Sequence, residues 1–306
     1  MLINVLTRNI NRFGLKNVKE MVSKSYSTGI KLIPVKLAHT AYENSTRTEE
    51  KSPLLILHGL FGSKQNWISI CKAYAQKLKP SRTVIALDLR NHGESEHSPE
   101  HSYAHLAEDV RHFVLQNGWS KVVLMGHSMG GRCAMLFALK YPDLLENLIV
   151  VDISPISLSP SLNEMTEILK VMNRVQIPTN VALSKARSLV EEQLANTIRE
   201  KDVRAFILTN LIPAGEASYK WRVNLPILIE KFHEIAKFEA PSDSQYNGET
   251  LFIGGEKSNY IPESDFPKIL KLFPKAELKY IAGAGHWVHA EKPNEFLKIT
   301  MDFLNK

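Results

Sequence analysis

The chain has 306 residues, 44% of them hydrophobic, a formal net charge of +6 and two cysteines. That length exceeds one small domain, but α/β folds of roughly 250 residues often form a single unit. Two cysteines are too few for a disulfide framework or a cysteine-based metal site, and no apolar run approaches the roughly 18 residues of a membrane-spanning helix. We interpret Cys71 and Cys133 as small buried hydrophobic residues on helices.

Residues 1–28 carry most of the excess positive charge. They hold five basic residues against one acidic residue, a net +4 that leaves +2 for the rest of the chain. No basic footprint for nucleic acid remains on the body of the protein. The segment is also rich in serine and has apolar residues at helical spacing from Ile3 to Phe13. This pattern predicts a mitochondrial transit peptide and residence in the matrix; the alternative is a disordered basic tail.

Short apolar runs that end in turn residues recur along the chain. They predict buried strands at 54–57, 84–87, 122–125, 148–151, 251–253 and 278–281. Because helical stretches alternate with these runs, they indicate a parallel sheet covered on both faces, with its chemistry at the carboxyl ends of the strands. An earlier pair, 31–37 and 38–43, would add an antiparallel edge.

About a hundred residues separate Asp152 from the next strand at Leu251. Helical patterns, broken by prolines, fall at about 162–173, 181–200, 203–211 and 225–238. A connection of that length needs a structure of its own. We therefore predict a helical cap over residues 155–239, inserted into an α/β core formed by residues 29–154 and 240–306.

Gly126-His127-Ser128-Met129-Gly130 is the most informative stretch of the chain. It follows the strand predicted at 122–125 and precedes a helical run from Arg132 to Lys140. A strand that turns into a helix through G-x-S-x-G is a nucleophile elbow, which exposes a serine Oγ above the sheet. Ser128 is therefore the predicted nucleophile.

A serine nucleophile needs an imidazole base. His286 follows the last predicted strand in a loop of small residues that can return over Ser128, whereas His289 is the alternative that we expect to pack under a terminal helix beginning near Pro293. His127 should point away from the nucleophile. A metal site at His97, His101 and His105 is disfavoured, because Pro99 interrupts the segment and no acidic cluster completes a ligand set.

The acid that orients the histidine is harder to assign. In most enzymes with a nucleophile elbow the acid follows the penultimate strand, where this chain has Ser258. Asp152 is the best replacement, because it ends the strand following that of Ser128 and neighbouring strands lie about 4.8 Å apart. The alternatives are that Asp152 only caps a turn, or that Glu256, Glu263 or Asp265 supplies the carboxylate.

Two loops complete the predicted site. The N–H groups of Leu60 and Met129 form the expected oxyanion hole, with Phe61 as an alternative donor. The polar residues Asp88, Arg90, Asn91 and His92 are interpreted as locking their own loop, or otherwise as substrate contacts. Three aromatic residues, Trp221, Phe61 and Trp287, either line an acyl pocket or belong to the core.

Five motifs in order resemble the α/β-hydrolase family. They are HGLFGS at 58–63, DLRNHGES at 88–95, GHSMGG at 126–131, VDISP at 151–155 and GAGHWVHAEKP at 283–293. The resemblance, from about residue 31 to 304, implies an eight-stranded, mostly parallel sheet, a helical cap, no cofactor and a serine mechanism on acyl esters or thioesters. Similarity to bacterial esterase and yeast ethanol acetyltransferase branches supports Asp152 as the acid. Similarity to an animal branch implies mitochondrial residence and acylglycerol-type lipid substrates.

We therefore predict a carboxylic ester hydrolase that forms an acyl-enzyme on Ser128, with Asp152 and His286 as its triad partners. The expected ligand is a small-molecule or lipid acyl ester; no metal, nucleic acid or transmembrane segment is expected, and nothing in the sequence identifies a protein partner. An acyltransferase or thioesterase with the same triad is the near alternative. A non-catalytic scaffold on this fold is the distant one.

Overall fold

A computed structural model describes residues 32–44, 51–158 and 161–306. Residues 34–306 form one compact unit. The predicted transit peptide, residues 1–28, lies outside the described residues. Within the described ranges, no helix combines the length and the apolar character needed to cross a bilayer.

The described residues include a seven-stranded sheet, whose strands lie in the order β1-β3-β2-β4-β5-β8-β9. The strands are β1 (His39–Tyr42), β2 (Leu54–Leu57), β3 (Val84–Leu87), β4 (Val122–His127), β5 (Leu145–Val151), β8 (Glu249–Gly255) and β9 (Ala276–Ile281). β1 pairs antiparallel with β3, and every other neighbouring pair is parallel. The predicted α/β architecture and the position of each predicted strand are confirmed. β9, however, is a partly exposed edge strand and not the buried strand expected.

The expectation of eight strands is wrong for the described part of the chain. Residues 32–38 form no strand in front of β1. Their N–H groups bind side chains instead: Val35 donates to Asp109 Oδ1 (2.8 Å) and Ala38 to Ser95 Oγ (2.8 Å). Because these donors are satisfied by loop and helix side chains, the segment needs no neighbouring strand.

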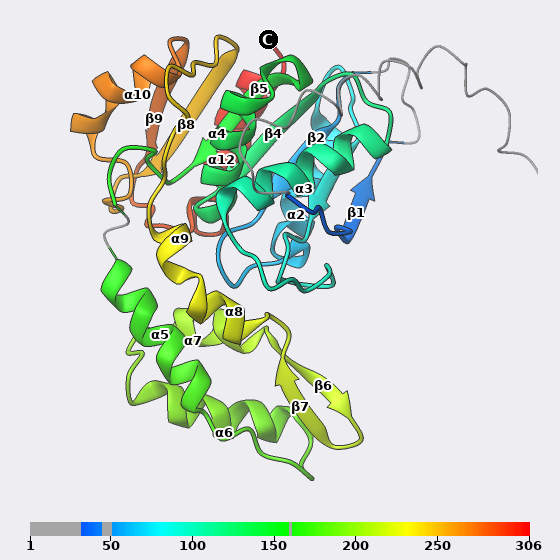
Figure 1. Cartoon of the computed structure of the whole chain (residues 1–306), viewed down its shortest axis with the longest axis vertical. Coiled ribbons are helices and arrows are strands. Elements are labelled where there is room, and N and C mark those ends of the chain that lie inside the picture. The colour runs from blue at the N-terminus through cyan, green and yellow to red at the C-terminus, as the bar shows by residue number, and fades with distance from the viewer. Residues whose placement is uncertain (1–31, 45–50, 159–160) are drawn as a thin grey trace, which may run out of the picture. The chain divides into compact units, whose positions relative to one another are not determined.

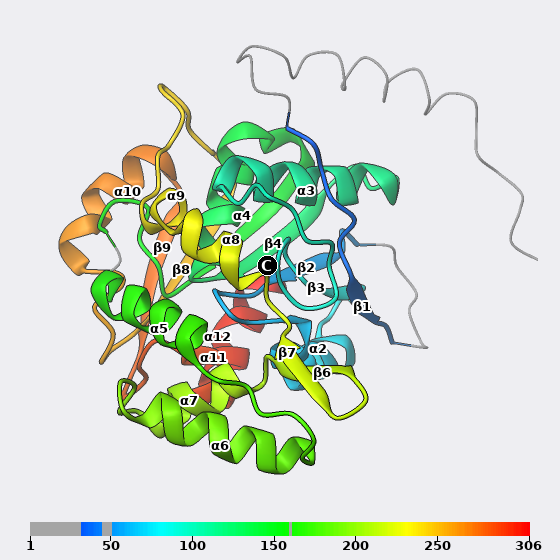
Figure 2. The ribbon, with the colours of Figure 1, turned by 60° about the horizontal axis from the view of Figure 1, so that its bottom comes forward.

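Helices cover both faces of the sheet (Figures 1 and 2). They are α2 (Ile68–Lys77), α3 (Tyr103–Gln116), α4 (Met129–Lys140), α10 (Phe266–Leu272), α11 (Val288–Glu291) and α12 (Pro293–Leu304), with short 3-10 turns η1 (Lys64–Trp67), η2 (Pro142–Leu144) and η3 (Glu263–Asp265). Alternate residues of each strand face opposite sides. Leu55 and Leu57 pack with α3 and α4, whereas Leu54 and Ile56 pack with α2 and α12.

The segment between β5 and β8, here called the insertion, lies beyond the carboxyl ends of the strands (Figure 1). Its elements are α5 (Leu162–Arg174), α6 (Leu183–Ala195), α7 (Lys201–Leu208), β6 (Leu211–Gly215), β7 (Ser218–Trp221), α8 (Leu225–Glu230) and α9 (Phe232–Ala236). Side chains from α5, α6, α7 and α8 form a hydrophobic cluster that includes Ile168, Val190 and Leu228, and Phe61 from the loop after β2 joins it. The insertion therefore has its own small core.

Two details of the insertion differ from the sequence prediction. Residues 211–221, of which only Leu211 belongs to the helix predicted at 203–211, form an antiparallel hairpin that pairs Leu211 with Trp221. Pro213 and Gly215 disfavour a helix there. The helix predicted at 225–238 is divided at Lys231 into α8 and α9.

Both cysteines are buried in the core, as predicted. Cys71 lies on α2 and Cys133 on α4, and both are free thiols. Burial raises the pKa of the Cys71 thiol to about 12, and burial also raises that of Cys133. Since a thiolate is the reactive form, neither side chain is prepared for nucleophilic chemistry.

Candidate active site

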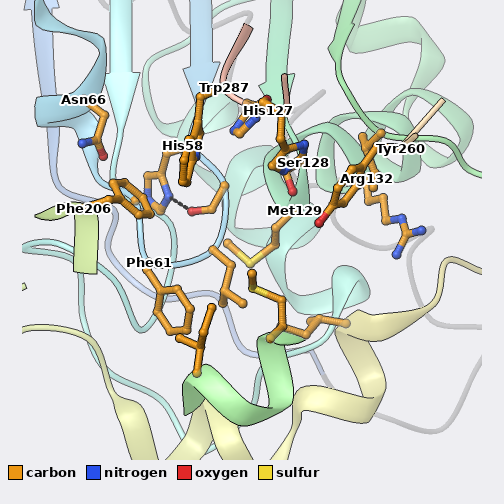
Figure 3. A pocket seen from close by; sticks show the side chains of 18 of the residues that line it. His58, Phe61, Asn66, His127, Ser128, Met129, Arg132, Phe206, Tyr260 and Trp287 are labelled. Atoms are coloured by element: carbon orange, nitrogen blue, oxygen red, sulfur yellow. Dashed lines mark hydrogen bonds between the residues drawn. The ribbon is translucent and has the colours of Figure 1, made fainter. Parts of the chain in front are cut away.

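Ser128 stands at the sharp turn between β4 and α4. Its φ of 53° lies in the left-handed region, which a serine adopts only when the surrounding structure imposes it. The close approach of the turn to β2 requires Gly130, because a Cβ there would lie 2.4 Å from the Leu57 carbonyl oxygen. The Ser128 side chain points into a cavity between the sheet edge and the insertion (Figure 3).

His286 lines the same cavity and contacts Asp152 (Nδ1–Oδ2, 2.7 Å). Asp152 directly follows β5, and the register pairs Val151 with His127, so Ser128 and Asp152 leave neighbouring strands at the same edge. The Asp152 carboxylate is fully buried, and its backbone has a φ of 51°. The structure thus brings the predicted base and acid together.

Two further donors hold the Asp152 carboxylate in place. The Gly255 N–H donates to Oδ1 (2.9 Å), and the Ser258 hydroxyl donates to Oδ2 (2.5 Å). Ser258 follows β8, at the position where an aspartate is expected. Its hydroxyl instead contacts Asp152, which follows the neighbouring strand β5. Hydrogen bonds from several donors fix the orientation of the carboxylate.

The other acids considered from the sequence have different partners. Glu256 accepts a hydrogen bond from the Gly283 N–H (2.8 Å), and Asp265 accepts one from the Ser154 hydroxyl (2.6 Å). Glu263 begins the 3-10 turn η3. Among the described residues, Asp152 is the carboxylate in contact with His286.

Two residues that the sequence analysis did not single out position His286. The Tyr260 ring stacks on the imidazole, with 3.8 Å between ring centroids. The Glu291 carboxylate accepts the N–H groups on either side of the histidine, from Gly285 (2.7 Å) and Trp287 (3.1 Å). Neither role has a signature in the local sequence, since both depend on how the 283–291 loop folds back.

The loop after β2 lies against Ser128. A Cβ placed on Gly59 would lie 3.2 Å from the Ser128 Cβ. The Leu89 N–H donates to His58 Nε2 (3.0 Å), so Nδ1 carries the proton and donates to the Gly59 carbonyl (2.8 Å; Figure 3). Because a trans peptide points its C=O and N–H in opposite directions, this bond turns the Leu60 N–H away from His58.

Met129 supplies the other predicted donor of the oxyanion hole. It is the first residue of α4, so its N–H has no acceptor within the helix. Both Leu60 and Met129 line the cavity with Ser128. Phe61 lines it as well, with a φ of 62°. All three donor candidates from the sequence are therefore grouped around the serine.

The two neighbouring histidines are buried and uncharged at neutral pH. His289 stacks on Trp67 at 4.0 Å and contacts Phe296 of α12, as expected of a residue packed under the terminal helix. Burial lowers its pKa to about 3. His127, which the sequence analysis expects to point away from Ser128, lines the cavity and contacts the His286 carbonyl oxygen through Nε2 (2.9 Å). Burial also lowers the His127 pKa.

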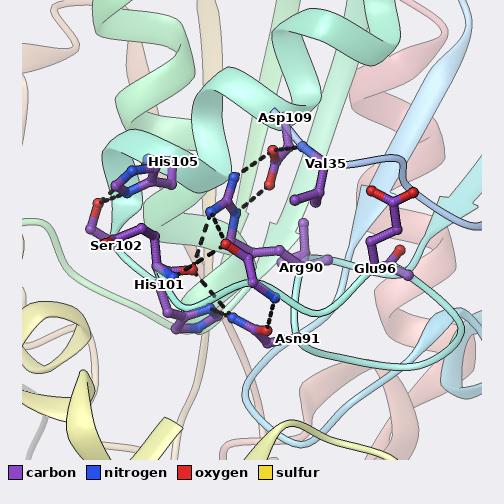
Figure 4. Close-up of polar contacts among 12 residues, drawn as sticks. Val35, Arg90, Asn91, Glu96, His101, Ser102, His105 and Asp109 are labelled. Carbon is purple, nitrogen blue, oxygen red and sulfur yellow. Dashed lines mark hydrogen bonds and ion pairs between the residues drawn. The ribbon is translucent and has the colours of Figure 1, made fainter. Parts of the chain in front are cut away.

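The polar loop after β3 is locked by a buried network (Figure 4). Arg90 binds both Asp109 oxygens, through Nε (2.6 Å) and Nη2 (2.7 Å), and Asn91 Nδ2 contacts His101 Nδ1 (3.3 Å). Asp88 binds the main-chain N–H and the ammonium of Lys64 (2.6 Å each). These contacts agree with a loop-locking role for Asp88, Arg90 and Asn91.

His92 is buried in this network, with Nδ1 against the Arg90 carbonyl oxygen (3.0 Å). In the described part of the chain, no group of His, Cys, Asp and Glu side chains is arranged to hold a metal ion. Trp287 lines the cavity, but Trp221 does not: its indole donates to the Met172 carbonyl (3.1 Å) inside the insertion. Of the two alternatives for Trp221, the structure therefore favours the core, since its side chain packs against the hydrophobic cluster of the insertion.

Comparisons with known proteins agree with this geometry. A family model described as alpha/beta hydrolase fold matches residues 52–293. The chain is 42% identical over 271 residues to a Danio rerio protein named sn-1-specific diacylglycerol lipase ABHD11, covering 89% of this chain and 83% of the relative. It is 33% identical over 296 residues to a probable alcohol acetyltransferase of Saccharomyces cerevisiae, covering 90% and 85%. The solved structure of a marine microorganism esterase is similar, with a TM-score of 0.80, 33% identity and coverage of 88% and 99%.

Proposed function

Because the chain belongs to the α/β-hydrolase fold family, we propose that it is a carboxylic ester hydrolase with Ser128 as its nucleophile. One observation carries the proposal: Ser128 and His286 line one cavity, His286 contacts the buried Asp152, and the Leu60 N–H in the adjacent loop is turned away from His58. Serine, base, orienting acid and main-chain donors are the parts that acyl transfer requires. No cofactor takes part in this mechanism.

The proposed reaction has two steps. His286 Nε2 takes the Ser128 proton as Oγ attacks the ester carbonyl, and the Leu60 and Met129 N–H groups stabilise the oxyanion. Asp152 fixes the proton on His286 Nδ1 and stabilises the imidazolium. The imidazolium then protonates the leaving alcohol, and a water molecule activated by His286 releases the acid from the acyl-enzyme.

The substrate class follows from the lining of the cavity. Beyond Ser128 its wall is made by Met165 and Ile168 of α5, and by Phe232 and Ile235 of α9. An apolar wall of this kind favours a hydrocarbon chain, because burying each CH₂ group contributes roughly 0.8 kcal/mol. Together with the diacylglycerol lipase name of the Danio rerio relative, this supports lipid or acylglycerol-type esters.

Activity-based labelling tests this proposal. The full chain is treated with a fluorophosphonate probe and assayed on acyl esters, acyl thioesters and diacylglycerols, with Ser128→Ala as the control. We expect labelling and ester hydrolysis that both disappear in the variant. An alcohol included in the assay separates hydrolysis from acyl transfer, because a transferase would form new ester faster than free acid. Absence of labelling in the folded parent protein would contradict the enzymatic proposal.

We infer two further points about organisation. Residues 155–239 act as a cap over the site, since side chains from α5, α7 and α9 line the cavity. Residues 1–28 direct import into the mitochondrial matrix, because they combine basic and serine-rich composition with helical apolar spacing. A fluorescent protein fused to residues 1–28 should enter mitochondria, and replacing Arg8 and Arg12 by glutamate should keep it in the cytosol. Equal distribution of both fusions would argue for a basic tail.

A further inference from the structure

Arg132 is a buried cation on the wall of the active-site cavity. It lies on α4, where its N–H donates to the carbonyl of Ser128 (3.1 Å), and its side chain is 1% exposed. Figure 3 shows this side chain extending away from Ser128. No carboxylate lies within ion-pair distance of its guanidinium among the described residues. A buried charge of this kind requires another set of polar partners.

Main-chain carbonyl groups supply those partners. Nε and Nη2 donate to the Ser154 carbonyl (3.3 Å each), Nη2 donates to Ser157 (2.8 Å) and Nη1 donates to Ala236 (2.9 Å). Ser154 and Ser157 lie in the connection from β5 to α5. Ala236 is the last residue of α9, where the connection back to β8 begins. One side chain therefore joins the nucleophile helix to both connections of the insertion.

These connections carry the apolar wall of the cavity. Ile153 precedes Ser154 in the first connection, and Ile235 precedes Ala236 in the second. Ile153, Ile235 and Ala236 all line the cavity. Tyr103 of α3 reinforces the return connection by donating to the Ile235 carbonyl (2.9 Å). A shift of the return connection at Ile235 and Ala236 thus changes the space for an acyl chain, and neither residue contacts His286 or Asp152.

We propose that Arg132 is a positioning residue that fixes the insertion over the acyl side of the cavity and thereby sets selectivity for acyl-chain length. This inference rests on the proposed ester hydrolase function. The planar guanidinium suits the role, because its five N–H donors can serve several carbonyls at once, whereas a lysine ammonium has three.

The test compares two esters that differ only in the acyl chain, p-nitrophenyl octanoate and p-nitrophenyl acetate. For Arg132→Met we expect the ratio of kcat/KM values, octanoate over acetate, to fall about tenfold, mainly through a higher KM for octanoate. Arg132→Lys, which keeps the positive charge, should lower this ratio less than Arg132→Met does. Tyr103→Phe, which removes the hydroxyl that donates to the Ile235 carbonyl and also interacts with the Arg132 guanidinium, should shift the ratio in the same direction but less.

Arg204→Met is the matched control. Arg204 also donates to main-chain carbonyls, those of Ile198 and Arg199 (2.8 Å each), but it lies within the insertion and does not line the cavity. The octanoate-to-acetate ratio of kcat/KM values for Arg204→Met should equal that of the parent protein. An unchanged ratio in the folded Lys and Phe variants, or equal losses on both esters in every variant, would overturn the proposal. Failure of the hydrolase function itself is distinguishable, because the parent protein would then cleave neither ester.

Discussion

Asp152 receives three hydrogen-bond contacts, and each comes from a residue at least 100 positions away in the sequence. These partners are the Gly255 N–H, the Ser258 hydroxyl and His286 Nδ1. Its positive φ directs the carboxylate from the end of β5 toward the loops that follow β8 and β9. At the scale of single residues, the proposed triad therefore depends on one strained position after β5.

Asp152→Asn should lower kcat on an acyl ester by roughly 10⁴-fold while the protein stays folded, because the amide no longer fixes the productive tautomer of His286. Steady-state kinetics and thermal unfolding of the same preparation measure both effects. Glu256→Gln is the control and should keep near-parental activity, since Glu256 binds the Gly283 N–H. Near-parental activity of Asp152→Asn would move the acid to the 256–265 loop.

The contact between Ser258 and Asp152 suggests that the acid can be moved between strands. Because Ser258 Oγ lies 2.5 Å from Asp152 Oδ2, an aspartate at 258 would bring a carboxylate close to His286. Ser258→Asp added to Asp152→Asn should raise kcat at least about tenfold over the single variant. Ser258→Asn in the same background supplies the same shape without the charge. Equal kcat values for the two double variants would refute the transfer of the acid.

The loop from His58 to Gly62 shows how a short connection is preorganised. His58 is buried, and burial lowers its pKa, so that it remains neutral with the proton on Nδ1. It links the Gly59 carbonyl to the Leu89 N–H, which joins the loops after β2 and β3. At the scale of elements, the geometry of the proposed oxyanion hole thus depends on the loops that follow two neighbouring strands, β2 and β3.

His58→Phe preserves a ring but removes both nitrogens, so that the Gly59–Leu60 peptide loses one of its anchors. We expect kcat to fall by roughly 10²-fold with little change in KM, because the lost interaction stabilises the transition state. Fluorophosphonate labelling should slow in parallel. His39→Gln, at an exposed position on β1, serves as the control. A parental kcat in folded His58→Phe would exclude this role.

Several buried histidines couple the stability of the whole molecule to pH. Burial lowers the pKa of His101 and of His289 to about 3, and burial also lowers the pKa of His92 and His127. An imidazole in the unfolded chain titrates near 6.5. Between these values the unfolded state binds more protons than the folded state, so stability falls as the pH falls below about 6.5.

Urea unfolding at pH 7 and pH 5 measures this coupling. Each histidine with so low a folded-state pKa should remove about 2 kcal/mol of unfolding free energy over that interval. His289→Phe, which can keep the stack on Trp67, should reduce the difference between the two pH values. His233→Gln is the control, because the His233 side chain is 76% exposed. An identical pH difference in His289→Phe and the parent protein would contradict this explanation.

The sequence by itself determined the features that depend on local pattern. Apolar runs ending in turn residues located the buried strands, and glycines around Ser128 indicated the turn between β4 and α4. The loops that carry His58 and His286 could be expected at the site, because parallel strands bring their carboxyl ends to one edge.

Only the tertiary structure decided the features that depend on long-range contact. Which acid contacts His286, what Ser258 does and how Arg132 joins α4 to the insertion depend on residues brought together across the fold. The hairpin at 211–221 is a similar case, since its strands are short and partly exposed. Local periodicity shows which residues of a segment are buried. It does not show which side chain from a distant part of the sequence contacts them.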